Sequence, residues 1–251
     1  MSSGASALAD QVAALGPWFH DLEILGVRTA PQHPLGNFLR ELWSIVGRQL
    51  PRDLTGKTVL DIGCNAGFYS QRLHERGARV TGIDHDPRYL AQARFAAGAL
   101  GYDIEFHELD VYDVERLGRR FDYVLLMGVL YHLRHPLLAL ERVARLPRER
   151  LVVQCMVRGA PAGGLEVPAD GPITDHARFD DPRYPAMYFV EHRYAGDPTN
   201  WWIPNEAGLA ALLRAAGLAI QAHPAPEVYV CAPGAGSGAR DGAGGTAGAA
   251  P

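Results

Sequence analysis

One short stretch decides the fold: Thr58-Val-Leu-Asp-Ile-Gly-Cys-Asn-Ala-Gly67. Residues 58–62 are rich in β-branched side chains, two glycines bracket a tight turn, and residues 68–77 read as a helix closed by glycine. The pattern predicts a strand, a loop and a helix. Glycines let a loop backbone approach a ligand, and free N–H groups at a helix start suit an anionic group such as a carboxylate. We therefore expect a nucleotide-like cofactor at this loop.

The spacing within this stretch separates two kinds of cofactor. A dinucleotide fingerprint reads G-x-G-x-x-G, but Asn65 stands where its second glycine belongs, and Asp61 precedes the turn. The order Asp-x-Gly-x-x-x-Gly resembles motif I of the Rossmann-like S-adenosylmethionine (SAM) methyltransferases. The resemblance implies that Asp61, Gly63, Asn65 and Gly67 bind the methionine end of SAM. A glycine turn that merely joins a strand to a helix is the alternative.

Composition limits the class of protein. The chain has 251 residues, of which 47% are hydrophobic, so it can bury a sizeable core in one domain with additions. The formal net charge of -4 argues against a surface dominated by nucleic-acid phosphates, although a local basic patch is compatible with it. Small or neutral substrates are therefore favoured over nucleic acid.

Cysteine usage and hydropathy bear on the compartment. Cys64, Cys155 and Cys231 lie far apart without a C-x-x-C pair, so neither disulfides nor a zinc site is indicated. The N-terminus lacks a signal-peptide pattern, and no apolar run approaches the roughly twenty residues that a membrane span needs. We expect a cytoplasmic protein without a membrane segment or a bound metal. The oligomeric state cannot be read from the sequence.

Acidic residues end the next two predicted strands. Residues 78–84 end at Asp84, and an acid at this position of a parallel sheet can accept hydrogen bonds from both ribose hydroxyls. Asp86 precedes a proline, which is a helix start signal, so we assign capping to Asp86 and ribose binding to Asp84. The following strand ends at Asp110 and Val111, which could hold the adenine ring, with Asp110 equally a turn acid.

A central strand and its exit loop supply the candidate catalytic residues. Residues 121–127 are almost continuously apolar, as in a parallel strand buried on both faces, and end at Met127. The loop that follows should lie beside the glycine turn, so its polar side chains are placed to meet a substrate. A histidine there can take a proton from a nucleophile, or it can be a satisfied structural residue. These side chains are Tyr131 and His132, assigned to catalysis, and Arg134 and His135, assigned to the substrate.

Two flanking segments are candidates for substrate contact. Residues 1–16 are predicted to be flexible, with a short helix over 7–15, and residues 17–50 to form a cap that ends in a helix over 37–50. Within this cap, Trp18 and His20 line the substrate site as a lid or pack in the core.

The second flanking segment is a long stretch rich in proline and glycine. Residues 158–200 have little periodicity, which is typical of a segment that shapes a binding site, so we interpret them as a substrate-side insertion within the domain over 51–233. Trp201 and Trp202 follow as an apolar wall or as core anchors. Residues 234–251 form a Gly/Ala tail too poor in apolar side chains to fold.

The alternation of strands and helices predicts an α/β fold. It indicates a doubly wound, seven-stranded and mostly parallel sheet that closes with an antiparallel pair over 218–222 and 227–231. The stretch Phe121-Asp-Tyr-Val-Leu-Leu-Met-Gly-Val-Leu-Tyr-His-Leu-Arg-His-Pro136 resembles the tRNA wobble-uridine carboxymethyltransferases. The resemblance covers roughly residues 18–233. It implies that Met127 contacts the cofactor and that Tyr131 lies in the active site.

Two departures from that family bear on the cofactor. The family grips the extra carboxylate of carboxy-SAM with a lysine before the core domain and an arginine near the C-terminus. Here no lysine precedes Lys57, and residues 224–231 contain no arginine. An unpaired carboxylate is costly to bury, so ordinary SAM is the expected cofactor.

These observations support one main hypothesis and three alternatives. The main hypothesis is a SAM-dependent methyltransferase that acts on a small molecule, with a sugar or another hydroxyl-bearing metabolite as the candidate class. The alternatives are a tRNA-modifying (carboxy)methyltransferase, a SAM-binding accessory protein without catalysis, and a nicotinamide-dependent oxidoreductase that rests on fold analogy alone.

Overall fold

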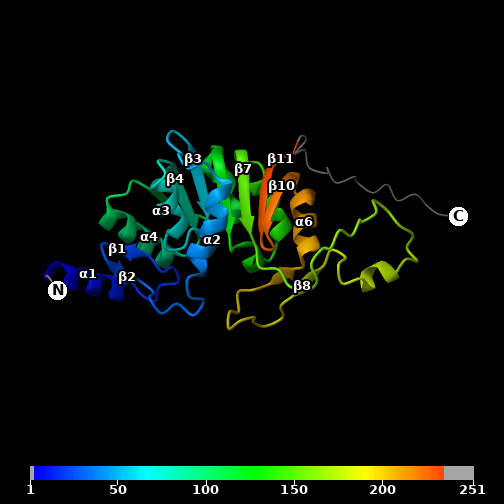
Figure 1. The fold of residues 1–251 in the computed structure, drawn as a ribbon, viewed down its shortest axis with the longest axis horizontal. Helices are drawn as coiled ribbons and strands as arrows, with labels where there is room; N and C mark the ends of the chain where they lie inside the picture. Colours follow the sequence, from blue (N-terminus) through cyan, green and yellow to red (C-terminus); the bar gives the residue numbers. More distant parts are fainter. Residues whose placement is uncertain (1–2, 235–251) are drawn as a thin grey trace.

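The computed structural model describes residues 3–234, and its centre is one seven-stranded sheet with the order β10-β11-β7-β6-β3-β4-β5 (Figure 1). Only β11 runs against its neighbours, pairing antiparallel with β10 and β7. The predicted mostly parallel sheet and its antiparallel end are thus confirmed. The strands are β3 Thr58–Ile62, β4 Arg79–Asp84, β5 Glu105–Glu108, β6 Phe121–Met127, β7 Pro147–Gln154, β10 Leu218–Ala225 and β11 Val228–Pro233. Most of the predicted tail, residues 235–251, lies outside the described residues.

Helices cover both faces of this sheet and create two apolar cores. Side chains of β3 alternate between them: Leu60 and Ile62 pack with α5, α6 and η2, while Val59 packs with α2 and α3. The central strands are therefore buried on both faces, which explains their near-continuous apolar sequence. The helices are α1 Ser3–Ala14, α2 Phe38–Val46, α3 Phe68–His74, α4 Pro87–Leu100, α5 Pro136–Val143 and α6 Glu206–Ala215, with 3₁₀ turns η1 Gly47–Gln49, η2 Val111–Leu117, η3 Leu130–His132 and η4 Ala177–Asp180.

The chain order places the binding edge of the sheet. After β3 the chain adds β4 and β5 on one side, then crosses to β6 and β7 on the other. Ligands of doubly wound sheets lie at the carboxyl ends of the strands, where the winding direction reverses. In this protein that point lies between β3 and β6. The N-terminal segment and the insertion that carries β8 lie on the same side of the sheet, below it in Figure 1.

A buried carboxylate organises the N-terminal segment. Asp21 accepts hydrogen bonds from Arg28, from Arg40 at 2.9 Å and from the N–H of Ala30 at 3.2 Å. The two arginine hydrogen bonds outweigh burial and hold the pKa of Asp21 below its usual value. Asp21 thereby ties the small hairpin of β1 Glu23–Ile24 and β2 Val27–Arg28 to α2.

The first helix is longer than the sequence predicts. Where a flexible segment over residues 1–16 with a helix over 7–15 is expected, α1 spans Ser3–Ala14. Its Val12 is buried, and the carbonyl of Val12 accepts a hydrogen bond from the indole N–H of Trp18 at 2.7 Å. The side chain of Gln92 on α4 donates to the carbonyl of Leu15 at 2.8 Å. These contacts dock the end of α1 on the domain.

One strand is placed differently from the prediction. A strand over 151–157 is expected from the apolar pattern, whereas β7 begins at Pro147 and ends at Gln154. Pro147 and Arg150 pair with Phe121 and Tyr123 of β6 on either side of an irregularity in register, and the exposed polar residues between them conceal the start of the strand from the hydrophobic pattern. None of the helices in the described part of the chain is long and apolar enough to cross a membrane.

His20 joins the N-terminal segment to the central helix unit. Its side chain is 5% exposed, and its Nδ1 accepts a hydrogen bond from the N–H of Phe68, the first residue of α3, at 3.2 Å. Gly67 at the helix start has no side chain to do this, so His20 caps α3 from a distant part of the chain. Burial, with a smaller contribution from His33, lowers the pKa of His20 to about 3. The imidazole is therefore neutral in the folded protein.

This cap predicts a pH-dependent stability. Because the pKa of His20 is lower in the folded state than the ordinary 6.5, the unfolded state binds the proton first, and stability is lost as pH falls below 6.5. We expect this residue to contribute a loss of about 2 kcal/mol between pH 7.5 and pH 5. Urea unfolding of His20→Gln should show a correspondingly weaker pH dependence. His192→Gln, which changes an exposed histidine, should keep the wild-type dependence. Equal slopes in all three proteins would contradict the assignment.

Candidate functional site

The backbone N–H groups of the glycine loop all donate hydrogen bonds within the protein. The sequence predicts free N–H groups at the start of α3, but the structure gives each N–H from Gly63 to Phe68 a partner within the protein. The open anion cradle that we expect from the sequence is therefore not present at these six groups, because acceptors from β4, from the loop itself and from His20 occupy them. The acceptors are Ile83 O for Gly63 and Cys64, Asp84 Oδ2 for Asn65, Asn65 Oδ1 for Ala66, Cys64 O for Gly67 and His20 Nδ1 for Phe68.

The shape of this loop requires its glycines. Gly63 and Gly67 have φ values of 69° and 87°, in the left-handed region that favours glycine. A Cβ atom on Gly63 would lie 2.4 Å from Cγ2 of Val129, so the glycine loop and the loop after β6 are in direct contact. Asn65 adopts a positive φ of 48°, which asparagine tolerates better than most residues. The sequence therefore predicts correctly that these two loops lie side by side.

Asp61 is a buried acid with one oxygen left over. Its Oδ2 accepts a hydrogen bond from the Ser70 hydroxyl at 2.6 Å, while its fully buried Oδ1 has no partner among the described residues. Burial raises the pKa of Asp61 to about 6, against the opposing effect of the Ser70 hydrogen bond. A buried carboxylate oxygen without a partner is costly. A cationic group such as an ammonium would satisfy it, which matches the α-amino group of SAM.

The structure confirms the capping role predicted for Asp86, whereas Asp84 has partners that the sequence did not show. Asp86 is the N-cap of α4, with its side chain accepting from the N–H of Arg88 at 2.8 Å. Asp84 lies at the end of β4 and accepts from the N–H groups of Asn65 and Asp86, both at 2.9 Å. Burial raises the pKa of Asp84, and these N–H bonds partly oppose the increase. Each oxygen keeps acceptor capacity, so a ribose role for Asp84 remains a prediction.

The remaining cofactor residues lie at the ends of β5 and β6. Asp110 caps η2 by accepting from the N–H of Tyr112 at 2.9 Å, which is the turn role considered above. Val111 and Met127 are almost fully buried at 6% and 7% exposure. Their place at the carboxyl ends of the strands agrees with contact to a cofactor, while their burial alone is equally that of core residues.

Tyr131 packs over the end of β6. A Cβ atom on Gly128 would lie 3.1 Å from the Tyr131 hydroxyl, and the ring centroid of Tyr131 is 4.4 Å from that of His132. Burial is the main cause that raises the pKa of Tyr131 far above the ordinary value. The phenol is therefore protonated at every physiological pH, and it can donate a hydrogen bond but cannot serve as a base.

His132 has partners that the sequence does not reveal. Its Nδ1 lies 2.8 Å from the hydroxyl of Thr199, and that hydroxyl donates to Oδ1 of Asp197 at 2.6 Å. Both partners lie at the end of the insertion, more than sixty positions from His132. No local spacing rule connects them, and the only nearby signal is their place directly before Asn200-Trp-Trp202. Burial lowers the pKa of His132, with Asp197 opposing the decrease.

The paired tryptophans fasten the insertion to the loop after β6. The N–H of Trp201 donates to the carbonyl of Tyr131 at 2.7 Å, and the indole of Trp202 donates to the carbonyl of Arg134 at 3.2 Å. The Arg134 guanidinium stacks 4.1 Å from the Trp201 ring centroid. Both residues are half-buried and held by these contacts, which agrees with the anchor role, while the apolar wall toward a substrate stays a prediction. Their strand, β9 Trp202–Pro204, pairs with β8 Met187–Phe189.

Three predicted substrate residues lie away from this group. The exposed His135 starts α5, and its N–H donates to the Tyr112 hydroxyl at 2.9 Å. Trp18 lines an open cavity of about 550 Å³ beside α1, among residues of the N-terminal segment. His20 is buried as the cap of α3. The contacts of Trp18 and His20 are those of packing, the alternative considered above, and their substrate roles stay predictions.

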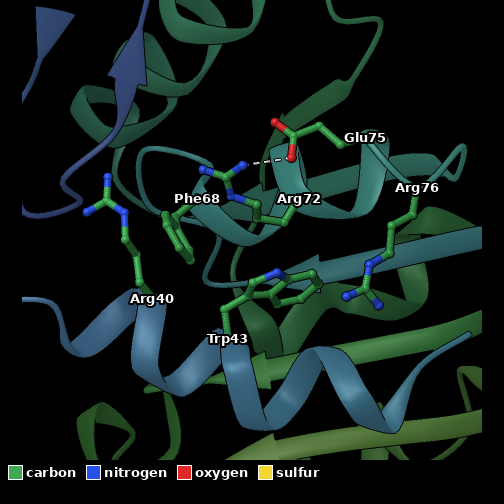
Figure 2. A pocket seen from close by; sticks show the side chains of 6 residues that line it. All are labelled: Arg40, Trp43, Phe68, Arg72, Glu75 and Arg76. Carbon is green, nitrogen blue, oxygen red and sulfur yellow. Dashed lines mark hydrogen bonds and ion pairs between the residues drawn. The ribbon is translucent and has the colours of Figure 1, made fainter. Parts of the chain in front are cut away.

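A basic cavity of about 360 Å³ lies outside the site, between α2 and α3 (Figure 2). Its three guanidinium groups all have partners within the protein: Arg40 with Asp21, Arg72 with Glu75 at 2.8 Å, and Arg76 with the carbonyl of Gly47 at 2.7 Å. Within residues 3–234, no group of three or more potential ligands among His, Cys, Asp and Glu is arranged to hold a metal ion.

Comparison with known proteins identifies the domain. Residues 59–149 match the family described as "Methyltransferase domain". The chain is 31% identical to the tRNA U34 carboxymethyltransferase of Cellvibrio japonicus over 68% of its length, and 34% identical to that of Pseudomonas paraeruginosa over 70%. It spans 48% and 49% of these proteins, about half the length of the curated relatives it matches.

Two solved structures with the same fold were determined with S-adenosylhomocysteine, which is SAM without its methyl group. The N-terminal domain of EvdMO1 with S-adenosylhomocysteine (SAH) bound is 20% identical, with a TM-score of 0.59 over 92% of this chain and 97% of that domain. The same domain in the presence of SAH and D-fucose gives a TM-score of 0.55 at 21% identity, over 92% of this chain and 95% of that domain. At these identities the likeness shows a shared fold.

The buried acid predicts a conflict between stability and binding. Ionised Asp61 destabilises the folded protein above the ordinary pKa of 3.8, so Asp61→Asn should stabilise the ligand-free protein by up to about 3 kcal/mol at pH 7.5. The gain should fall by about half at pH 5, where Asp61 is largely protonated. The same variant should bind SAM at least about tenfold more weakly. Urea unfolding and calorimetric titration measure the two effects. A variant less stable than wild type at both pH values would overturn the electrostatic explanation.

Proposed function

Since the chain carries the methyltransferase domain of Rossmann-like SAM-dependent enzymes, we propose that it methylates a hydroxyl group of a small molecule, with sugars as the first candidate class. One arrangement carries the proposal. Asp61, near the end of β3, keeps a buried oxygen without a partner among the described residues, and His132 in η3 keeps a supported imidazole, while the loops that follow β3 and β6 touch through Gly63 and Val129. The Asp61 oxygen suits the cationic amino group of SAM, and the His132 imidazole suits a hydroxyl that must lose a proton.

The residues at the carboxyl ends of the strands fit SAM. In this proposal Asp61, with Gly63, Asn65 and Gly67, binds the methionine end, where the unpartnered Oδ1 accepts from the ammonium. Asp84 at the end of β4 accepts from the ribose hydroxyls. Asp110, Val111 and Met127 enclose the adenine and the remaining apolar parts. The N-terminal segment over 17–50 caps the cofactor side, and the insertion over 158–200 forms the acceptor side.

Methyl transfer from SAM does not require the protein to form a covalent bond with the substrate. Bound SAM supplies an activated methyl carbon on a sulfonium. The protein contributes orientation, exclusion of water and removal of the acceptor proton. His132 is neutral near pH 7 because burial lowers its pKa, so it can accept that proton. Tyr131 donates a hydrogen bond that orients the acceptor, since its raised pKa keeps the phenol protonated.

Aromatic side chains near His132 support an acceptor with a flat apolar face. Trp201 and Trp202 are bound to the loop after β6, and the ring of Phe189 lies 4.8 Å from that of Trp202. Such rings pack against the C–H face of a sugar while polar groups at their edges bind its hydroxyls. Arg134 and Asp197 are polar groups in this position, and D-fucose accompanies one structural neighbour.

Ordinary SAM fits this chain better than carboxy-SAM. The curated relatives are carboxymethyltransferases by name, but the first lysine here, Lys57, precedes β3 at the opposite end of the sheet and pairs with Glu149 at 2.6 Å. Arg158, near the carboxyl end of β7, is hydrogen-bonded to the Tyr194 hydroxyl at 2.7 Å and paired with Glu227 at 3.4 Å. An added carboxylate would compete with these existing partners.

A tRNA substrate is the second candidate, which the names of the relatives favour and the geometry does not. The chain spans about half of those relatives. The arginines of the basic cavity in Figure 2 are held by Asp21, Glu75 and a backbone carbonyl, so they offer little free charge to phosphates.

Calorimetric titration tests the cofactor. We expect SAM and SAH to bind, with carboxy-SAM and NAD much weaker. Asp84→Ala should weaken SAM binding by about 1 to 3 kcal/mol, because hydrogen bonds to a charged acceptor are lost. Asp86→Ala, which removes the cap of α4 and an exposed ion pair with Arg88, should leave SAM affinity unchanged and cost about 1 kcal/mol of stability. Preferential binding of carboxy-SAM would reject ordinary SAM and return tRNA to first place.

Turnover tests the catalytic pair. With a hydroxyl acceptor drawn from a sugar panel, His132→Gln should lower kcat by about a hundredfold or more, because the base is lost. Tyr131→Phe should lower kcat less, and both variants should keep wild-type SAM affinity. Formation of SAH from SAM by mass spectrometry gives the rate. Full activity in both variants would refute the assignment.

A further inference from the structure

The end of the insertion is a rigid turn that faces His132. The backbone N–H and carbonyl groups of Tyr194 and Asp197 pair with each other at 3.0 and 3.1 Å. The buried side chain of Asn200 donates to the carbonyls of the same two residues, at 3.0 and 3.4 Å. The next residue, Trp201, is bonded to Tyr131, directly before His132. The turn is thus fixed both internally and to the loop after β6.

The assignment of hydrogen-bond donors and acceptors around His132 determines which ring nitrogen carries the proton. An ionised Asp197 can only accept hydrogen bonds, and its Oδ1 accepts from both the N–H and the hydroxyl of Thr199, at 2.7 and 2.6 Å. The single hydroxyl hydrogen of Thr199 is therefore used toward Asp197. Its oxygen, 2.8 Å from Nδ1, can only accept from His132. On this assignment the proton of the neutral imidazole lies on Nδ1, and Nε2 has no side-chain hydrogen-bond partner among residues 3–234.

The charges around His132 agree with this arrangement. Burial, the largest effect, and His85 disfavour a positive imidazolium, while Asp197, whose Oδ2 lies 3.8 Å from Nδ1, and a backbone hydrogen bond to Thr199 favour it. On its own loop the neighbouring ring is Tyr131, which stays uncharged. The imidazole is thus neutral before the reaction and acquires a nearby counter-charge once it is protonated. These are the requirements of a general base.

We propose that Asp197 and Thr199 are positioning residues, which hold His132 in the Nδ1–H form so that Nε2 takes the acceptor's hydroxyl proton. This rests on the methyltransferase function proposed above. The acceptor O–H bond breaks, its electron pair stays on oxygen, and the proton forms the new Nε2–H bond. The resulting imidazolium is stabilised by Asp197 through the Thr199 hydroxyl. The insertion therefore completes the catalytic site.

The tautomer of His132 can be measured without any substrate. Long-range ¹H–¹⁵N NMR spectra of uniformly labelled protein distinguish Nδ1–H from Nε2–H imidazoles, and His132→Gln identifies the signals. We expect the Nδ1–H form in the wild-type protein and in Thr199→Ser. Thr199→Val keeps the shape of the side chain but removes the hydroxyl that links His132 to Asp197, a link that we call the relay. It should therefore shift the tautomer population toward Nε2–H and lower the pKa of His132. Thr174→Val, an exposed position in the same insertion, serves as the matched control.

The outcomes separate this proposal from the proposed function. An Nε2–H form in the wild type, or an unchanged tautomer and pKa in Thr199→Val, would overturn the relay even if the protein methylates an acceptor. The expected tautomers without SAM binding would keep the relay and reject the function. With an acceptor in hand, Thr199→Val should lower kcat by about tenfold or more at unchanged KM, with recovery in Thr199→Ser. A change in KM alone would indicate a substrate contact instead.

Discussion

The structure depends on how the glycine loop between β3 and α3 satisfies its backbone. A buried N–H group without a partner is costly, and the six successive N–H groups from Gly63 to Phe68 each have an acceptor. Acceptors come from β4, from the loop itself and from His20 in the N-terminal segment. The requirement for acceptors thereby holds the segment before the sheet against its centre. Asp61 is the exception in this otherwise satisfied region, since its Oδ1 has no hydrogen-bond partner within residues 3–234.

The sequence predicts those parts of the structure that depend on local pattern. Apolar strands, the glycine turn and Asp86 before Pro87 each act within a few residues, so the sheet, the loop and the cap of α4 are confirmed. The prediction of β7 is displaced because its amino end carries exposed polar residues, which give no strand signal. The place of Tyr131 and His132 after a central strand follows from the general geometry of parallel sheets.

Contacts between distant segments could not be predicted. His20 appears in the sequence beside aromatic residues, and nothing in that pattern shows that it caps a helix 48 positions later. Thr199 and Asp197 are ordinary polar residues in a segment without periodicity, and they gain meaning only because Trp201 pairs with the loop after β6. In both cases the function of the side chain depends on a docking event that local spacing does not encode.

Only the last residues of the insertion anchor it to the loop after β6, so the position of His132 does not depend on the rest of the insertion. Asp197, Thr199 and Trp201 lie within a few positions of one another and are fixed directly to the loop after β6. The outer part of the insertion, where Ile173 and Phe179 are 94% and 70% exposed, takes no part in that attachment. Its length and side chains can therefore diverge among homologues while His132, the proposed base, keeps its alignment. The fold is modular in this sense: acceptor choice can evolve in one segment without rebuilding the reaction centre.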